Sequence, residues 1–171
     1  MEANIGNKGI DFERTVRAFS ADLYRYAYWL CRDRFVAEEL VQEMFARAWK
    51  SWAELRDPGS VKPWLIAILR NERARMFARK QIPIAEEDVS ELEIPAEIPT
   101  MAENLDVKRQ LERLPLPYRE PLLLQVLGGF SCAEIASMLN TSEGAVMTRL
   151  TRARQAMRQD VAIPVKRKAT S

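Results

Sequence analysis

The stretch that decides the fold is residues 131–158, SCAEIASMLNTSEGAVMTRLTRARQAMR. It opens with Ser-Cys-Ala-Glu at 131–134, in which the serine and the glutamate can each satisfy a free backbone N–H at the start of a helix. A tight turn at residues 140–141 ends this short helix. Thr141 or Ser142 then provides an N-cap for a second helix. The pattern therefore predicts two consecutive helices joined by a turn.

The second of these helices has one apolar stripe and one polar, basic surface. Val146, Leu150, Ala153 and Met157 are spaced four, three and four residues apart, which places them on one buried face. The remaining faces carry Glu143, Met147, Thr148, Arg149, Thr151, Arg152, Arg154 and Arg158. A short helix, a tight turn and a longer basic helix are typical of a helix-turn-helix, whose second helix enters the major groove. A helical hairpin with a solvated charged face is the alternative, and the density of arginines favours DNA binding.

The rest of the chain is helical by its pattern, and no segment shows the alternation of a strand. Upstream of the helix-turn-helix, the spacing of apolar residues predicts helices at 105–114 and 118–127, with Pro121 in the first turn of the latter. Gly128 and Gly129 end that helix. The sequence therefore indicates an all-α protein.

The N-terminal part predicts three more helices. The first covers residues 11–31, and Asp33 opens the second. A turn at 56–60 leads to the third, which Ser60 caps and which ends near Lys80.

The helix that follows Ser60 changes character along its length. Its first half, WLIAIL at 64–69, is apolar and is expected to be buried. Its second half carries Arg70, Asn71, Arg73, Arg75, Arg79 and Lys80. Basic side chains interleaved with aromatic ones suit unpaired DNA. A solvated face is the alternative. Trp49 and Trp64 are expected to pack in the core.

Composition excludes most catalytic sites. The 171 residues, enough for one large or two small domains, contain no histidine, two cysteines and six glycines. Without histidine there is no Ser-His-Asp or Cys-His pair and no His-ligated metal. Acidic Mg²⁺ chemistry remains conceivable, but its candidates Glu86, Glu87 and Asp88 lie in a linker. We therefore expect no catalytic residue, metal or cofactor.

The small net charge of +2 hides a strong pattern along the chain. Residues 1–80 have 15 Lys/Arg against 11 Asp/Glu, and residues 107–171 have 11 against 5. Residues 81–106 have no Lys/Arg and 8 Asp/Glu. Prolines interrupt this acidic block, so residues 81–102 are predicted to be an extended linker, which could span roughly 75 Å at ~3.4 Å per residue. A flexible spacer fits the composition equally well.

No apolar run approaches the roughly 18 residues that a membrane span needs. The N-terminal residues are polar, and two cysteines make no disulfide scaffold. These features predict a cytoplasmic protein without membrane insertion.

Together these segments resemble the extracytoplasmic-function (ECF) group of bacterial sigma-70 factors. The resemblance rests on AEELVQEMFARAWK (37–50), KPWLIAILRNERARMFARK (62–80) and LPLPYREPLLLQVLGGFSCAEIASMLNTSEGAVMTRLTRAR (114–154). It implies sigma region 2 at residues 10–80, the acidic linker at 81–102 and sigma region 4 at 103–163.

The resemblance also implies roles for individual residues. Those matching the helix that binds the β′ clamp of core RNA polymerase are Glu39, Gln42, Glu43 and Arg47; from the residues alone, a surface helix is equally possible. Those matching the −10 reader are Arg56, Asp57, Ser60, Lys62, Asn71, Arg75, Arg79 and Lys80, of which Arg56 to Ser60 correspond to the loop that captures a flipped base. Those matching the −35 reader are Ser142, Glu143, Met147, Thr148, Arg149, Thr151, Arg152 and Arg154.

Three positions depart from the family pattern. Met147 stands where many relatives have a basic residue, Cys132 where an aromatic is common, and Met76-Phe77 where Trp-Leu is common. Cys132 is interpreted as a small buried residue.

The resemblance implies a sigma factor that directs core RNA polymerase to −10 and −35 promoter elements, with region 4 on the β flap and an anti-sigma factor as inhibitor. The alternative is a helix-turn-helix regulator that binds duplex DNA alone.

Overall fold

The computed structural model describes residues 2–80 and 105–159. The predicted linker at 81–102, including the candidate metal ligands Glu86, Glu87 and Asp88, lies outside the described residues, as do residues 103–104 and 160–163. The chain divides into two compact units, residues 1–99 and 100–171. Every regular element in the described ranges is helical, which confirms the all-α prediction. No described helix is long and apolar enough to cross a membrane.

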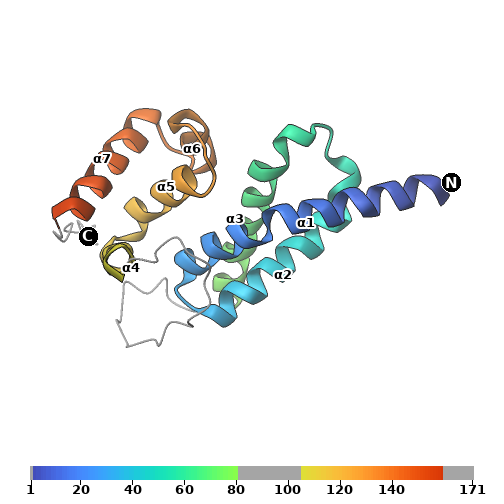
Figure 1. The fold of residues 1–171 in the computed structure, drawn as a ribbon, viewed down its shortest axis with the longest axis horizontal. Coiled ribbons are helices and arrows are strands. Elements are labelled where there is room, and N and C mark those ends of the chain that lie inside the picture. The colour runs from blue at the N-terminus through green and yellow to red at the C-terminus, as the bar shows by residue number, and fades with distance from the viewer. Residues whose placement is uncertain (1, 81–104, 160–171) are drawn as a thin grey trace. The chain divides into compact units, whose positions relative to one another are not determined.

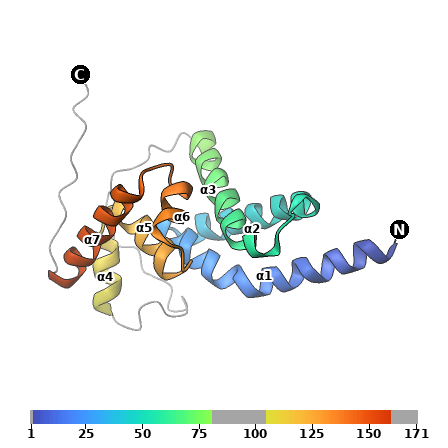
Figure 2. The ribbon, with the colours of Figure 1, turned by 90° about the horizontal axis from the view of Figure 1, so that it is seen from above.

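The first unit contains three long helices, α1 (Glu2–Cys31), α2 (Arg34–Ser51) and α3 (Val61–Lys80), with the short 3-10 helices η1 (Trp52–Glu54) and η2 (Pro58–Ser60) between α2 and α3. Helix α2 packs against both α1 and α3 (Figures 1 and 2). Each long helix supplies large, fully buried side chains, among them Tyr26, Leu40, Met44, Leu65 and Leu69.

The predicted junction between α1 and α2 is confirmed, whereas the predicted start of α1 is wrong. Asp33 caps α2, since its carboxylate accepts a hydrogen bond from the backbone N–H of Val36 at 3.0 Å. Helix α1 begins at Glu2 rather than Asp11. Once a helix is nucleated, each added residue contributes one hydrogen bond, so the helix extends beyond its buried face until a breaker intervenes.

One cluster of aromatic side chains in the first unit joins α1, α2, η1 and α3. The Phe12 ring lies 5.1 Å from both Trp49 and Trp52, measured between centroids, and Trp52 lies 6.1 Å from Trp64. Trp49 is nevertheless 49% exposed, so the expectation that it packs in the core is wrong. Its ring contacts Phe12 of α1, and about half of the side chain stays exposed to solvent. Ala67 of the apolar stretch in α3 also faces outward.

The second unit contains α4 (Leu105–Arg113), α5 (Leu116–Val126), α6 (Cys132–Met138) and α7 (Glu143–Gln159). Helix α7 packs against both α5 and α6 (Figure 1). Side chains from all four helices close the core, among them Leu111, Leu123, Ile135 and Leu150.

Helix α5 begins two residues earlier than predicted, and Pro121 therefore lies inside it rather than in its first turn. A proline there removes one hydrogen bond of the helix. The side chain of Pro121 is buried. Its burial in the core compensates for the missing donor, which a sequence pattern does not reveal.

The two glycines after α5 each have a distinct role. Gly129 has a left-handed φ of 69°, and its N–H donates to Gln125 O while the N–H of Phe130 donates to Leu124 O. The bond from Gly129, the residue with positive φ, to Gln125 is that of the αL ending of a helix. A Cβ on Gly128 would lie 2.3 Å from the ring of Phe130, so only glycine allows the ring to fold back over the turn.

Candidate nucleic-acid interface

The helix-turn-helix is built by local hydrogen bonds at each helix start. The hydroxyl of Ser131 accepts from the N–H of Glu134 at 3.2 Å, and the carboxylate of Glu134 accepts from the N–H of Ser131 at 2.8 Å. The predicted capping box is thus confirmed. The hydroxyl of Ser142 accepts from the N–H of Ala145 at 3.1 Å, so Ser142, of the two candidates, begins α7.

The capping box predicts a specific response to acid. The hydrogen bond from the backbone of Ser131, with that from its side chain, lowers the pKa of Glu134 below its usual range. A carboxylate with a lowered pKa stabilises the fold above the pKa of the unfolded chain, and this contribution disappears as the pH falls through the folded pKa. We expect the carboxyl carbon of Glu134, followed by NMR, to titrate at lower pH in the folded protein than in the unfolded chain. In Glu134→Gln, the protection of the Ser131 amide should lose its pH dependence. A titration at the unfolded value would contradict this prediction.

The exposed surface of α7 carries most of the residues predicted to read the −35 element. Val146, Leu150 and Ala153 are buried against α5 and α6, which turns the polar faces outward. The exposed members of the predicted set are Ser142, Glu143, Met147, Thr148, Thr151, Arg152 and Arg154. Arg149 is half-buried.

Several side chains of this surface already have partners within the unit. The hydroxyls of Thr148 and Thr151 donate to the carbonyls of Gly144 and Met147, at 3.0 and 2.9 Å. Each hydroxyl oxygen keeps lone pairs that can accept a hydrogen bond from DNA. Arg154 donates to the side-chain oxygen of Gln125 in α5. For Arg149 and Arg152, the other two arginines of the predicted set, no side-chain hydrogen bond to another described residue defines the orientation.

A second group of predicted residues lies on α2. Gln42 is exposed, and the exposed Glu39 pairs with Lys80 of α3 at 3.1 Å. Glu43 pairs with Arg47 at 3.5 Å. The prediction of a mixed acidic and amide surface on this helix therefore corresponds to side chains at the surface of the unit.

The turn between α2 and α3 is organised by Asp57. Its carboxylate accepts from the N–H of Gly59 at 2.9 Å and from the hydroxyl of Ser60 at 2.8 Å. The first of these bonds, with the second, lowers the pKa of Asp57. Asp57 is thus the N-cap of η2, the short helix that leads into α3. The hydroxyl of Ser60, which was predicted to cap α3, donates to Asp57. Arg56 beside it is exposed.

The predicted −10 residues of α3 divide into two environments. Asn71, Arg75, Arg79 and Lys80 are exposed at the basic end of the helix. Lys62, at the other end, is half-buried, with its Nζ 5.8 Å from the centre of the Phe19 ring and 3.7 Å from Asp22. The first four thus occupy the C-terminal half of α3, and Lys62 lies near its N-terminal end, roughly 2.5 turns before Asn71.

The sequence pattern does not reveal two charged side chains that are buried in the described part of the chain. Glu72 is 1% exposed and Arg119 is 4% exposed. Glu72 could have been noticed, because it is the one acid among the basic residues 70–80. Nothing in the pattern around Arg119 distinguishes it from a surface arginine.

Both units match known families. Residues 15–82 match the model for "Sigma-70 region 2", and residues 104–157 match the model for "Sigma-70, region 4". The chain is 31% identical over 143 residues to "ECF RNA polymerase sigma factor SigM" of Bacillus subtilis, covering 80% of this chain and 86% of that protein. It is 32% identical over 160 residues to "Probable RNA polymerase sigma factor RfaY" of Xanthomonas campestris, covering 88% of this chain.

The relatives differ in length. The chain spans 40% of the length of the Xanthomonas protein and 62% of that of ECF sigma factor SigE of Mycolicibacterium smegmatis, to which it is 30% identical over 88% of its own length. Among solved structures, it is similar to the sigma factor RpoE in complex with the anti-sigma factor NepR from Bartonella quintana. That match has a TM-score of 0.67 at 25% identity and covers 87% of this chain and 95% of the other.

Proposed function

Because the chain belongs to the extracytoplasmic-function group of sigma-70 factors, we propose that it binds core RNA polymerase and directs it to promoters through −10 and −35 elements. The observation that carries this proposal is the presence, in one chain, of a helix-turn-helix with an exposed polar recognition surface and a separate unit with a basic helix end. A stand-alone helix-turn-helix regulator would require only the first of these.

Residues 103–163, which lie within the second unit, take the role of region 4. Its α7 reads the −35 element through the predicted set that runs from Ser142 to Arg154, with Arg149 and Arg152 as the side chains for guanine edges or phosphates. Burial of the stripe that includes Val146 and Leu150 supports this orientation. The same unit docks on the β flap.

Residues 10–80, which lie within the first unit, take the role of region 2. Asn71, Arg75, Arg79 and Lys80 face the −10 DNA, and Lys62 contributes from the opposite end of α3. The turn at 56–60, preset by the hydrogen bonds of Asp57, holds the flipped base. Glu39, Gln42, Glu43 and Arg47 bind the β′ clamp.

The remaining parts of the proposal concern regulation and location. The linker at 81–102, purely acidic in its charges, follows the polymerase interior toward the RNA exit path. An anti-sigma protein holds the factor inactive, which the similarity to a sigma factor solved with its anti-sigma partner supports. The protein acts in the cytoplasm and supplies no catalysis, cofactor or metal.

Transcription with purified components tests this function. Core RNA polymerase, mixed with the protein and fragmented genomic DNA of the source bacterium, should initiate a defined set of transcripts, which sequencing will map to shared −10 and −35 elements. If core polymerase alone produces the same transcripts, the proposal is wrong. Tight footprints on duplex DNA without polymerase would favour the stand-alone regulator.

A double substitution on α2 tests the polymerase contact. We expect Gln42→Ala with Glu43→Ala to weaken binding to core polymerase about tenfold, because both side chains are exposed and polar contacts at an interface are typically lost at this scale. Thermal unfolding should change little, since neither side chain is buried. Competition against labelled wild-type protein measures the affinity, with Glu54→Ala in η1 as the matched control. Equal affinities for the double variant and the control would remove this assignment.

A further inference from the structure

Glu72 is a buried carboxylate that depends on two arginines for its charge balance. It is 1% exposed, and its Oε1 accepts a hydrogen bond from Nη1 of Arg75 at 3.1 Å. The same oxygen forms an ion pair with Nε of Arg47, which reaches it from α2. Its other oxygen, Oε2, is buried with no hydrogen-bond partner among the described residues. A charge in this position is strongly unfavourable unless a cation accompanies it.

The two arginines differ in where else they can bind. Arg75 lies on the basic end of α3, and 55% of its side chain is exposed. Arg47 is 41% exposed and is bracketed by two acids, Glu72 and, at 3.5 Å, Glu43. The third arginine of this region, Arg73, is stacked on the Phe77 ring at 4.8 Å instead. Arg75 is therefore the partner that can move from Glu72 to DNA, and Arg47 is the partner that can remain paired with Glu72.

If Arg75 were the sole partner of Glu72, its transfer to a DNA phosphate would leave a buried carboxylate uncompensated. With Arg47 on the same oxygen, the carboxylate keeps one cation after Arg75 has moved. We propose that Arg47 is the standing counter-ion of Glu72 and thereby releases Arg75 for a phosphate of the −10 strand. This inference rests on the proposed function and gives Arg47, beside its proposed contact with the polymerase clamp, a positioning role for DNA.

Arg47→Met tests this inference in the complex with core polymerase. The readout is the affinity for a labelled single strand that carries the −10 element mapped in the transcription experiment, measured at several salt concentrations. Because Arg47 is also proposed to contact the β′ clamp, strand binding is measured with enough core polymerase to saturate every variant. The slope of log affinity against log salt should shrink by about 0.7, the contribution of one phosphate contact on a single strand.

A rescue experiment distinguishes the loss of the counter-ion of Glu72 from a mere change in the net charge of the protein. In Arg47→Met with Glu72→Gln, no buried charge holds Arg75, so the salt slope should return to the wild-type value. Arg47→Met with Glu38→Gln has the same net charge but keeps the carboxyl group of Glu72 as a partner for Arg75, so the slope should stay reduced. Glu38 is suitable because it lies on α2, the helix that carries Arg47, and pairs with Arg34. The rescued variant also covers the case in which Arg47→Met alone does not fold, because it contains no unpaired buried charge.

The outcomes distinguish this inference from the function on which it rests. Reduced core affinity in both Arg47→Met and the rescued variant, with an unchanged salt slope, would overturn the inference and leave Arg47 as a polymerase contact. Equal slopes for the Glu72→Gln and Glu38→Gln combinations would also overturn it. Arg79→Met, on the same exposed helix end, should reduce the slope irrespective of Glu72. If the wild-type complex does not bind the strand at all, the proposed function itself fails.

Discussion

Simultaneous replacement of Arg149 and Arg152 by alanine is expected to reduce initiation from a promoter with a −35 element by about 30-fold or more. Each lost base contact costs about 1–3 kcal/mol, and 1.4 kcal/mol corresponds to a factor of ten. Arg152 is exposed, and Arg149 is half-buried at the edge of the buried stripe of Val146, Leu150 and Ala153. The folded structure should persist, because neither side chain belongs to the core.

The matched control for this pair is Arg158→Ala, an exposed arginine in the last turn of the same helix. It lies outside the predicted recognition set and should reduce initiation much less. Run-off transcription should be compared on the natural promoter and on one with a scrambled −35 element, where the double variant and the wild type should converge. Undiminished initiation by the double variant on the natural promoter would show that α7 is wrongly placed as the recognition helix.

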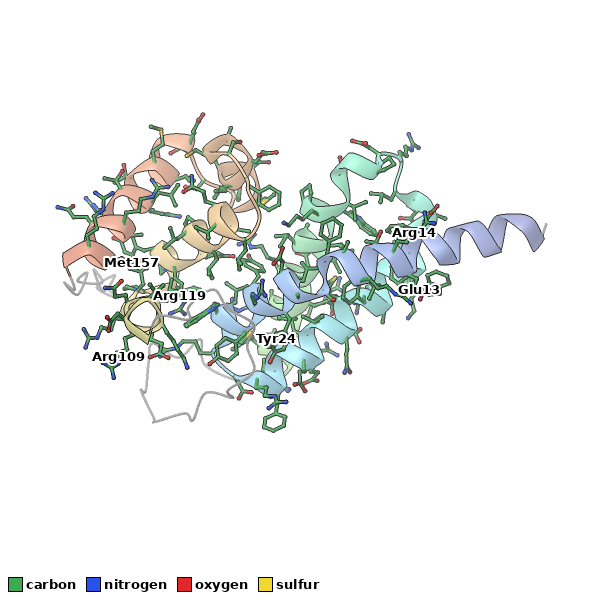
Figure 3. All side chains as sticks on the ribbon, in the orientation of Figure 1. Glu13, Arg14, Tyr24, Arg109, Arg119 and Met157 are labelled. Atoms are coloured by element: carbon green, nitrogen blue, oxygen red, sulfur yellow. The ribbon has the colours of Figure 1, made fainter. Side chains whose placement is uncertain are left out.

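Arg119→Met is expected to destabilise the second unit by about 3 kcal/mol. The guanidinium is 4% exposed, and its Nη1 donates to the carbonyls of Leu114 at 2.9 Å and Leu111 at 3.4 Å, where α4 ends (Figure 3). Hydrogen bonds to a charged group contribute about 1.5–3 kcal/mol, and their loss leaves buried carbonyls without this donor. Methionine retains the apolar volume of the side chain but provides no donor.

The distribution of tryptophan makes this prediction measurable unit by unit. All four tryptophans lie in the first unit, at positions 29, 49, 52 and 64. Urea unfolding of Arg119→Met should therefore shift to lower denaturant by circular dichroism, while tryptophan fluorescence follows the wild-type curve. Arg109→Met, an exposed substitution on α4, is the control. An unchanged dichroism curve for Arg119→Met would mean that water or another donor replaces the guanidinium.

Local signals in the sequence were sufficient for the helices themselves and for their caps. The N-cap at Asp33 and the capping box at Ser131 and Glu134 were predicted from residues three apart, because a cap is a bond between near neighbours. The buried stripe of α7 followed from the helical period. Errors arose where a local rule met a long-range contact, as with Pro121 inside α5 and the half-exposed Trp49.

In the candidate interfaces too, local signals were readable from the sequence and long-range contacts were not. The pattern of polar residues on α7 predicted its recognition surface, and the basic end of α3 was evident from composition. The linear pattern did not show that Arg154 donates a hydrogen bond to Gln125, which is 29 residues away. Nor did it show that Lys62 lies over the Phe19 ring and pairs with Asp22. Such pairings depend on how helices pack against one another, and packing selects among side chains that look equivalent in a linear pattern.

The sequence by itself determined the helical class, the three blocks of charge and the family to which the chain belongs, because periodicity, capping and motif spacing are properties of neighbouring residues. Only the tertiary structure decided which charges are buried. Glu72 and Arg119 look like surface residues until α2 brings Arg47 to the first and the end of α4 brings its carbonyls to the second. A buried charge is tolerable only where partners such as Arg47 of α2 or the carbonyls at the end of α4 meet it, and these contacts form only when the helices pack.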